Sequence, residues 1–145
     1  MHKDLIAISV RKFPKLLEAD RTGPPQNPFH QFGIEIGNGW FRIFYQMLSD
    51  LDELRKSGEY IALRQVKEKW GGLRVYIDGP DEADDIVSKY SEMSYQICEI
   101  CGQKGKPRND GWIMTLCDTH HGNRNAPCSE ETINLMIKDA KDGTI

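Results

Sequence analysis

Two pairs of potential metal ligands near the C-terminus constrain the fold of this chain more than any other feature. Two residues separate Cys98 from Cys101 and Cys117 from His120, and fifteen residues lie between the pairs. This spacing lets a tight knuckle direct two side chains to one ion, and it is typical of structural zinc sites. Gly102 follows the first pair, where the backbone must turn sharply. The sequence therefore predicts a structural Zn²⁺ bound by Cys98, Cys101, Cys117 and His120.

Spacing alone leaves alternatives for the ligand set. A disulfide framework would need an oxidising compartment, and we find no signal peptide and no apolar run that could span a membrane, so we expect a cytoplasmic protein. His121 is the alternative to His120, which we prefer because it lies one helical turn after Cys117 and shares its face. Cys128 is interpreted as a small buried hydrophobic residue, with a ligand role as the alternative.

Length and charge limit the class of protein. A chain of 145 residues suits an α+β core over residues 1–97 and a zinc-binding subregion with a C-terminal helix over residues 98–145, packed as one domain. The net charge of −3 gives no reason to expect general nucleic-acid binding. Residues 55–76 nevertheless hold six basic and two acidic side chains, whereas residues 80–99 hold six acidic side chains and one lysine. Two solvated faces or a partner surface would explain this asymmetry.

Apolar periodicity predicts the helices. The strongest stripe runs through residues 39–57, ends at Gly58 and is interpreted as core; it contains Trp40, Phe41, Phe44, Met47, Leu48, Leu51 and Leu54. A first helix over residues 4–19 is interrupted at Pro14. Residues 21–31 read as a loop, and residues 32–36 as an extended segment. Pro80 begins an acidic helix that runs to about residue 97. Ser129 caps a last helix that ends before Gly143.

A β-hairpin is predicted over residues 60–78. A turn at Gly71–Gly72 would pair Trp70 with Leu73, Glu68 with Val75 and Val66 with Ile77. One face would then be apolar apart from Glu68. The other face would be basic with one aromatic side chain, and it is our candidate partner-binding surface: Lys67, Lys69, Arg74 and Tyr76.

In the metal region, residues 102–109 read as a polar loop and residues 112–116 as a β-prone run that leads into the second ligand pair. A knuckle, a hairpin and a ligand pair at a helix start form a treble clef, and a zinc ribbon is the alternative. We therefore expect an α+β fold, with a small core of helices and a β-hairpin and a C-terminal treble-clef-like or zinc-ribbon site.

Three short segments of the chain carry a recognisable pattern. Residues 67–76 read Lys-Glu-Lys-Trp-Gly-Gly-Leu-Arg-Val-Tyr, residues 98–102 read Cys-Glu-Ile-Cys-Gly, and residues 116–120 read Leu-Cys-Asp-Thr-His. Together with Gly39–Trp40 and Gly111–Trp112, these segments resemble one group of small bacterial and phage zinc-binding proteins, and the resemblance covers roughly residues 37–121. It implies a zinc site and a phage or prophage context, and it supplies no activity, because the group has no established function.

Recognisable catalytic machinery does not emerge from the sequence. Residues 116–121 loosely resemble the ending of HNH-type nucleases, but His2 and His30 are not placed to act as the catalytic histidine. Three cysteines and a histidine fill all four zinc positions and leave none for water. We therefore expect a non-enzymatic zinc-stabilised protein that binds another protein, as an inhibitor of a host defence or transcription component. The alternatives are a nucleic-acid-binding regulator that uses the basic hairpin face and an HNH-like nuclease relic.

Overall fold

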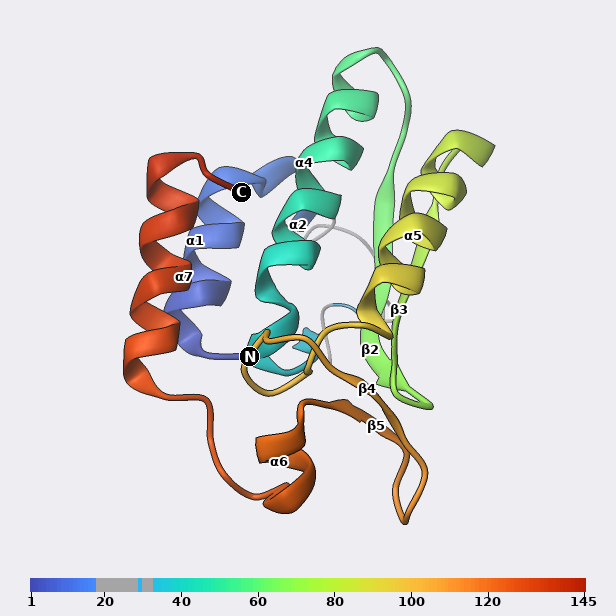
Figure 1. Ribbon diagram of the computed structural model, residues 1–145. Helices are drawn as coiled ribbons and strands as arrows, with labels where there is room; N and C mark the ends of the chain where they lie inside the picture. The colour runs from blue at the N-terminus through green and yellow to red at the C-terminus, as the bar shows by residue number, and fades with distance from the viewer. Residues whose placement is uncertain (18–28, 30–32) are drawn as a thin grey trace.

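The computed structural model describes residues 1–17, 29 and 33–145 of the chain, and it is a mixed α+β fold, as predicted (Figure 1). The loop predicted for residues 21–31 lies outside the described residues apart from Phe29. The elements, in chain order, are α1 (Lys3–Lys12), α2 (Pro14–Leu17), β1 (Ile34–Glu35), the 3₁₀ turn η1 (Asn38–Trp40), α4 (Phe41–Lys56), β2 (Ala62–Lys69), β3 (Gly72–Asp78), α5 (Asp81–Ser94), β4 (Lys106–Arg108), β5 (Met114–Leu116), α6 (Asp118–Gly122) and α7 (Glu130–Asp142).

Helix α4 lies at the centre of the core and packs against α2, α5 and α7 (Figure 1). The predicted stripe is confirmed, because its side chains are buried except for the partly buried Leu54. Helix α7 also packs against α1, and the Arg42 guanidinium donates to the Asp139 carboxylate at 2.6 Å. The last helix is therefore part of the helical layer. No described helix is long and apolar enough to cross a lipid bilayer.

Local sequence signals set the helix boundaries. Helix α1 ends before Phe13 and α2 begins at Pro14, which confirms the predicted interruption. The Ser129 hydroxyl accepts a hydrogen bond from the Thr132 backbone N–H at 3.1 Å and caps α7, as expected. Gly143 ends that helix with a φ of 71°.

The β2–β3 hairpin differs from the predicted register by two residues. Lys69 pairs with Gly72, so the turn is Trp70–Gly71 and not Gly71–Gly72. Both turn residues have positive φ, 55° and 76°, as a type I′ turn requires. Gly72 begins β3 instead, and a Cβ atom there would lie 2.5 Å from the end of the Tyr95 side chain.

The face assignments survive this correction, because a shift of two residues leaves every side chain on its original side. Val66 pairs with Val75 and Glu68 with Leu73 on the apolar face. Trp70 was expected on that face and instead lies in the turn with an exposed side chain.

Neighbours cover both sides of the hairpin. Strand β1 pairs with β2 in parallel, an arrangement that the sequence did not reveal. Helix α5 lies beside β3, where the Ser94 hydroxyl accepts the Leu73 N–H at 2.9 Å. Pro80 is the N-cap residue of α5 and not its first helical residue, so the helix begins one residue later than predicted, and it ends at Ser94, before the predicted residue 97. Strand β1 and helix α5 thus hold the hairpin against the core, from which its tip projects (Figure 1).

Candidate metal centre

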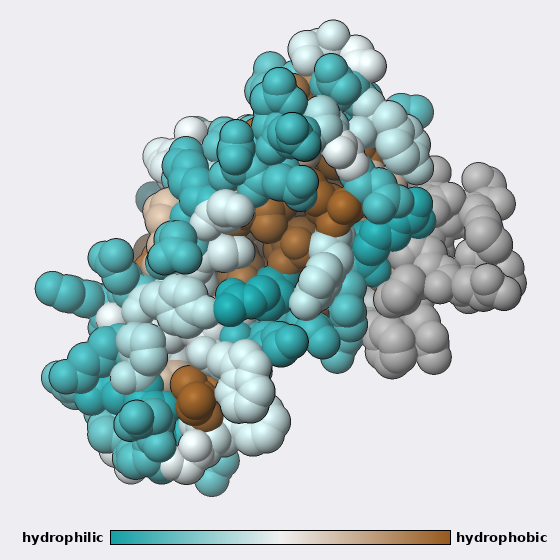
Figure 2. Space-filling model, turned by 90° about the vertical axis from the view of Figure 1, so that its right-hand side faces the viewer, coloured by the Kyte–Doolittle hydropathy of each residue, from teal (hydrophilic) through white to brown (hydrophobic). Residues whose placement is uncertain are grey.

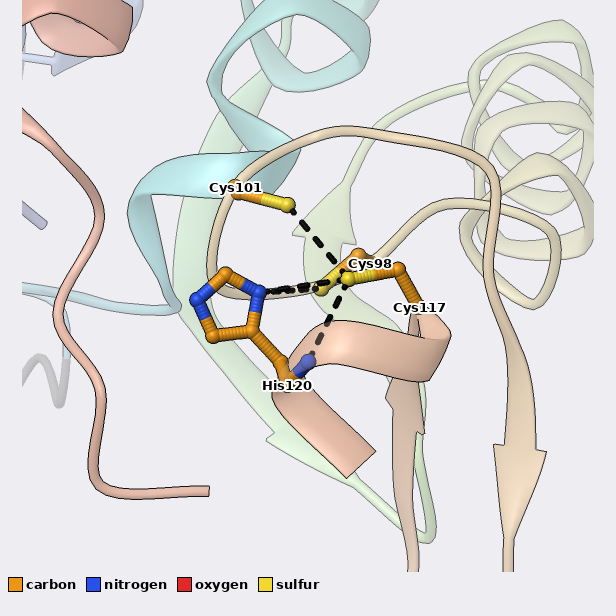
Figure 3. Close-up of side chains that lie close together, drawn as sticks. All are labelled: Cys98, Cys101, Cys117 and His120. Atoms are coloured by element: carbon orange, nitrogen blue, oxygen red, sulfur yellow. Dashed lines mark hydrogen bonds between the residues drawn. The ribbon is translucent and has the colours of Figure 1, made fainter. Parts of the chain in front are cut away.

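Four potential ligand side chains converge between the end of α5 and the start of α6 (Figure 3). Cys98 and Cys101 belong to a tight turn in which the Gly102 N–H donates to the Cys98 carbonyl at 2.9 Å. Gly102 has a φ of 79°, so the sharp turn predicted at this glycine is confirmed. The two cysteines are thereby directed to one point.

The second pair lies at a helix start. Cys117 is the N-cap residue of α6, and its sulfur accepts the His120 N–H at 3.5 Å. His120 lies in the first turn, which brings its ring beside the sulfur of Cys117 (Figure 3). The β4–β5 hairpin connects the two pairs, so the region has the treble-clef order of knuckle, hairpin and helix.

The distances fit a tetrahedral metal site. The Cys101 and Cys117 sulfurs are 3.8 Å apart, and His120 Nδ1 lies 3.3 Å from the Cys117 sulfur and 3.6 Å from the Cys98 sulfur. Tetrahedral coordination with metal–sulfur bonds of about 2.3 Å and a metal–nitrogen bond of about 2.0 Å gives edges of about 3.8 Å and 3.5 Å. These four residues could therefore hold one metal ion.

The thiols also favour a cation electrostatically. Burial raises the pKa of Cys101 to about 12, and the nearby Cys98 acts in the same direction. Burial alone would raise the pKa of Cys117 too, but hydrogen bonds from the backbone and side chain of His120 lower it to about 7. Three neighbouring thiolates repel one another, so a bound cation is what would let all three ionise.

The alternative ligands have other surroundings. His121 Nε2 lies 2.7 Å from an Asp110 carboxylate oxygen, and its Nδ1 lies 3.3 Å from the Arg108 guanidinium. Cys128 is buried in the apolar core, as interpreted from the sequence. Among the described residues, the cluster of possible metal ligands consists of Cys98, Cys101, Cys117 and His120. It includes neither His121 nor Cys128.

The knuckle packs directly against the start of α4. The Gly39 N–H donates to the Glu99 carbonyl at 2.8 Å, and the Trp40 indole donates to the Ile97 carbonyl at 2.8 Å. A Cβ atom at Gly39 would lie 2.0 Å from the Cys98 carbonyl oxygen, and one at Gly37 would lie 2.2 Å from that of Glu99. These two glycines thus provide the contact surface for the metal region, a role that their sequence pattern did not predict.

Glu99 is a buried acid within the knuckle, and one of its carboxylate oxygens has no hydrogen-bond partner among the described residues. Burial raises its pKa to about 7, and the charge of Glu68 acts in the same direction. The Gly37 backbone and the Met1 amine oppose the shift. Ionised Glu99 is therefore a cost to the fold near neutral pH.

Glu99→Gln is expected to stabilise the protein more at pH 8 than at pH 5.5. Because the folded-state pKa of about 7 exceeds the ordinary value of 4.5, the folded protein binds more protons between these values, and stability falls as pH rises through that window. Glutamine does not ionise, so the variant does not lose stability in this way. At pH 8 its free energy of unfolding in urea should exceed that of the wild type by on the order of 2 kcal/mol. A bound divalent ion with three thiolates carries a net charge of −1. This charge also disfavours ionised Glu99, so the expected direction of the pKa shift is the same with the metal bound. Equal effects at both pH values would contradict the assignment.

The predicted partner-binding residues share one face of the hairpin but differ in their contacts. Arg74 pairs with Lys67 across the strands, donates to the Tyr95 hydroxyl at 2.7 Å and lies 5.8 Å from that ring's centroid. The Arg74 side chain therefore helps to hold the end of α5 against β3. Tyr76 is exposed farther along the strand. Lys67 and Lys69 form no ion pair with any described residue. Partner binding by these four residues stays a prediction.

Comparison with protein-family models, curated proteins and solved structures gives no match. The fold and the site themselves define the class, which is an α+β protein with a Cys₃His cluster that could bind a metal ion. The resemblance to small bacterial and phage proteins stays a sequence-based prediction.

Proposed function

We propose that this protein is a non-enzymatic, zinc-stabilised binding protein that acts by contacting another protein. The observation that carries the proposal is the closed ligand set: three thiols and one imidazole at tetrahedral spacing, next to a projecting hairpin tip. Thiolate and imidazole are preferred zinc ligands, and four protein ligands leave no position at which a metal could activate water. The ion would then serve structure, and exposed side chains nearby would serve recognition.

The expected binding surface includes the basic side of the hairpin. Lys67 and Lys69 would steer an acidic partner, and exposed aromatic side chains would supply rigid contact area. The sequence resemblance adds a phage or prophage setting, which makes a host defence or transcription protein the first target class to test, with the protein as its inhibitor. Such a role needs no reaction at the metal.

The test is capture of a protein partner by the zinc-loaded protein from nuclease-treated cell extract, followed by reconstitution with the purified partner. We expect the wild type to retain one specific protein and the variant Lys67→Glu with Lys69→Glu to lose it at unchanged zinc content. Arg74 is left intact because of its contact with Tyr95. The proposal would be rejected if none of the captured proteins, once purified, binds the wild type.

A nucleic-acid-binding regulator is the second candidate, because exposed tryptophans lie beside Lys67 and Lys69. Aromatic stacking combined with basic side chains is typical of single-strand binding. This function would instead give binding that disappears after nuclease treatment and weakens steeply with salt.

A further inference from the structure

An open cleft of about 320 Å³ separates the tip of the β2–β3 hairpin from the loop between β4 and β5. Its walls are mainly apolar and include Trp70 on one side and Gly111, Trp112 and Ile113 on the other. The face shown in Figure 2 carries an apolar spot near its lower end, apart from the larger apolar area in the middle. That lower end is where Figure 1 places the β4–β5 hairpin and the tip of the β2–β3 hairpin. The cleft is large enough for one or two side chains.

Two tryptophans flank this cleft with most of their surface in water. The exposed fraction is 66 % for Trp70 and 75 % for Trp112, whereas Trp40 is fully buried in the core. Tryptophan is highly buried on average and is enriched at the energetic centres of protein interfaces. Two such side chains across one cleft form a concentrated binding surface.

Trp70 occupies a backbone conformation that disfavours it. It is the only non-glycine residue with positive φ in the described part of the chain. At this turn position, asparagine or glycine is preferred and a bulky side chain is an outlier. Such an outlier at a site where the side chain is mostly exposed supports a role in recognition.

Hydrogen bonds hold both walls in place. The Thr115 hydroxyl donates to the Gly71 carbonyl at 2.6 Å and so joins β5 to the hairpin tip. The Glu68 carboxylate accepts the Gly71 N–H at 2.7 Å. Arg124 donates to the Trp112 carbonyl and to the Asp110 carboxylate. The cleft is thus preformed, which lowers the entropy cost of binding.

The charge at the rim is positive. Lys67 and Lys69 line the cleft, and neither forms an ion pair within the described part of the chain. Glu68 also lines the cleft, where its carboxylate accepts the Gly71 N–H, so the two lysines exceed the acidic side chains of the lining by one. An acidic ligand with an apolar group would complement both the rim and the walls.

We propose that the cleft between Trp70 and Trp112 binds an acidic peptide segment that inserts one apolar side chain. This inference rests on the proposed function, since it assumes a protein partner and assigns the chemistry of its binding segment. A single nucleic-acid strand fits less well. The cleft offers only two lysines for the several phosphates of a strand.

The test uses short synthetic peptides in which Asp and Glu flank a central Leu, Phe or Trp, titrated against the zinc-loaded full chain. Matched peptides replace the central residue by Ser or the acids by Lys, and oligothymidylate serves as the nucleic-acid probe. We expect only the acidic peptides with an apolar centre to bind, and we expect Trp112→Ala to weaken that binding by about tenfold or more. Tyr60→Ala removes a similarly exposed aromatic outside the cleft and should change nothing.

Trp70→Asn separates recognition from folding. It gives the turn the Asn–Gly sequence that type I′ prefers, so the thermal midpoint should stay level or rise while peptide binding is lost. Equal binding of the Ser-centred peptides, or binding that survives both tryptophan substitutions, would overturn the inference. Tryptophan-dependent binding of oligothymidylate alone would overturn it in favour of nucleic acid. If the peptides fail while a purified protein partner still binds through Lys67 and Lys69, the cleft is rejected and the proposed function stands.

Discussion

Cys98→Ser is expected to remove the metal from the purified protein and to unfold at least residues 98–122. The serine cannot supply a thiolate, and metal binding and local folding are coupled in sites of this kind. Because the knuckle packs against Gly39 and Trp40, the loss should also loosen the start of α4. The stability loss should be on the order of 3 kcal/mol or more. Elemental analysis, thermal unfolding and hydrogen exchange measure the three effects.

Matched cysteine variants make this test specific. Cys117→Ser should behave like Cys98→Ser, whereas Cys128→Ala should keep about one zinc per chain and cost about 1 kcal/mol, because that thiol is packed in the core. Zinc loss in Cys128→Ala would show that the fourth ligand is wrongly assigned. Absence of metal from wild-type protein prepared without chelator would refute the site itself.

Gly39→Ala is expected to destabilise the protein by about 3 kcal/mol and to weaken metal binding. Helix propensity alone predicts the opposite sign, a gain of up to about 1 kcal/mol. The reason is close contact: the added Cβ would lie 2.0 Å from the Cys98 carbonyl oxygen and 2.5 Å from the Gly102 nitrogen, and both are backbone atoms. Relief would require the knuckle to move away from α4. Urea unfolding and competition with a zinc chelator measure the two losses.

Gly122→Ala is the control for that experiment. Gly122 is also helical and lies in the metal region, but a Cβ atom there would meet no other atom within 4 Å. This substitution should be neutral or slightly stabilising. If Gly39→Ala is equally harmless, the contact between η1 and the knuckle does not hold the two regions together.

Local features were predictable from the sequence because the signal and the structure lie within a few residues. The four ligand positions, the buried stripe of α4 and the Ser129 cap are of this kind, and the structure places each as expected. Long-range features were not predictable. The pairing of β1 with β2 joins segments that are distant in sequence, and so does the contact of Gly72 with Tyr95 beside the hairpin turn. The exposure of Trp70 follows from the position of that turn.

The backbone-to-backbone contact between η1 and the knuckle limits how freely the metal region could be exchanged between proteins. Here the two glycines, Gly37 and Gly39, present almost no side chain to adjust. A transplanted stretch of residues 98–122 would therefore need residues 37–40 to travel with it. The metal region and the η1 turn that precedes the central helix therefore form one structural unit, which the chain encodes in two separate segments.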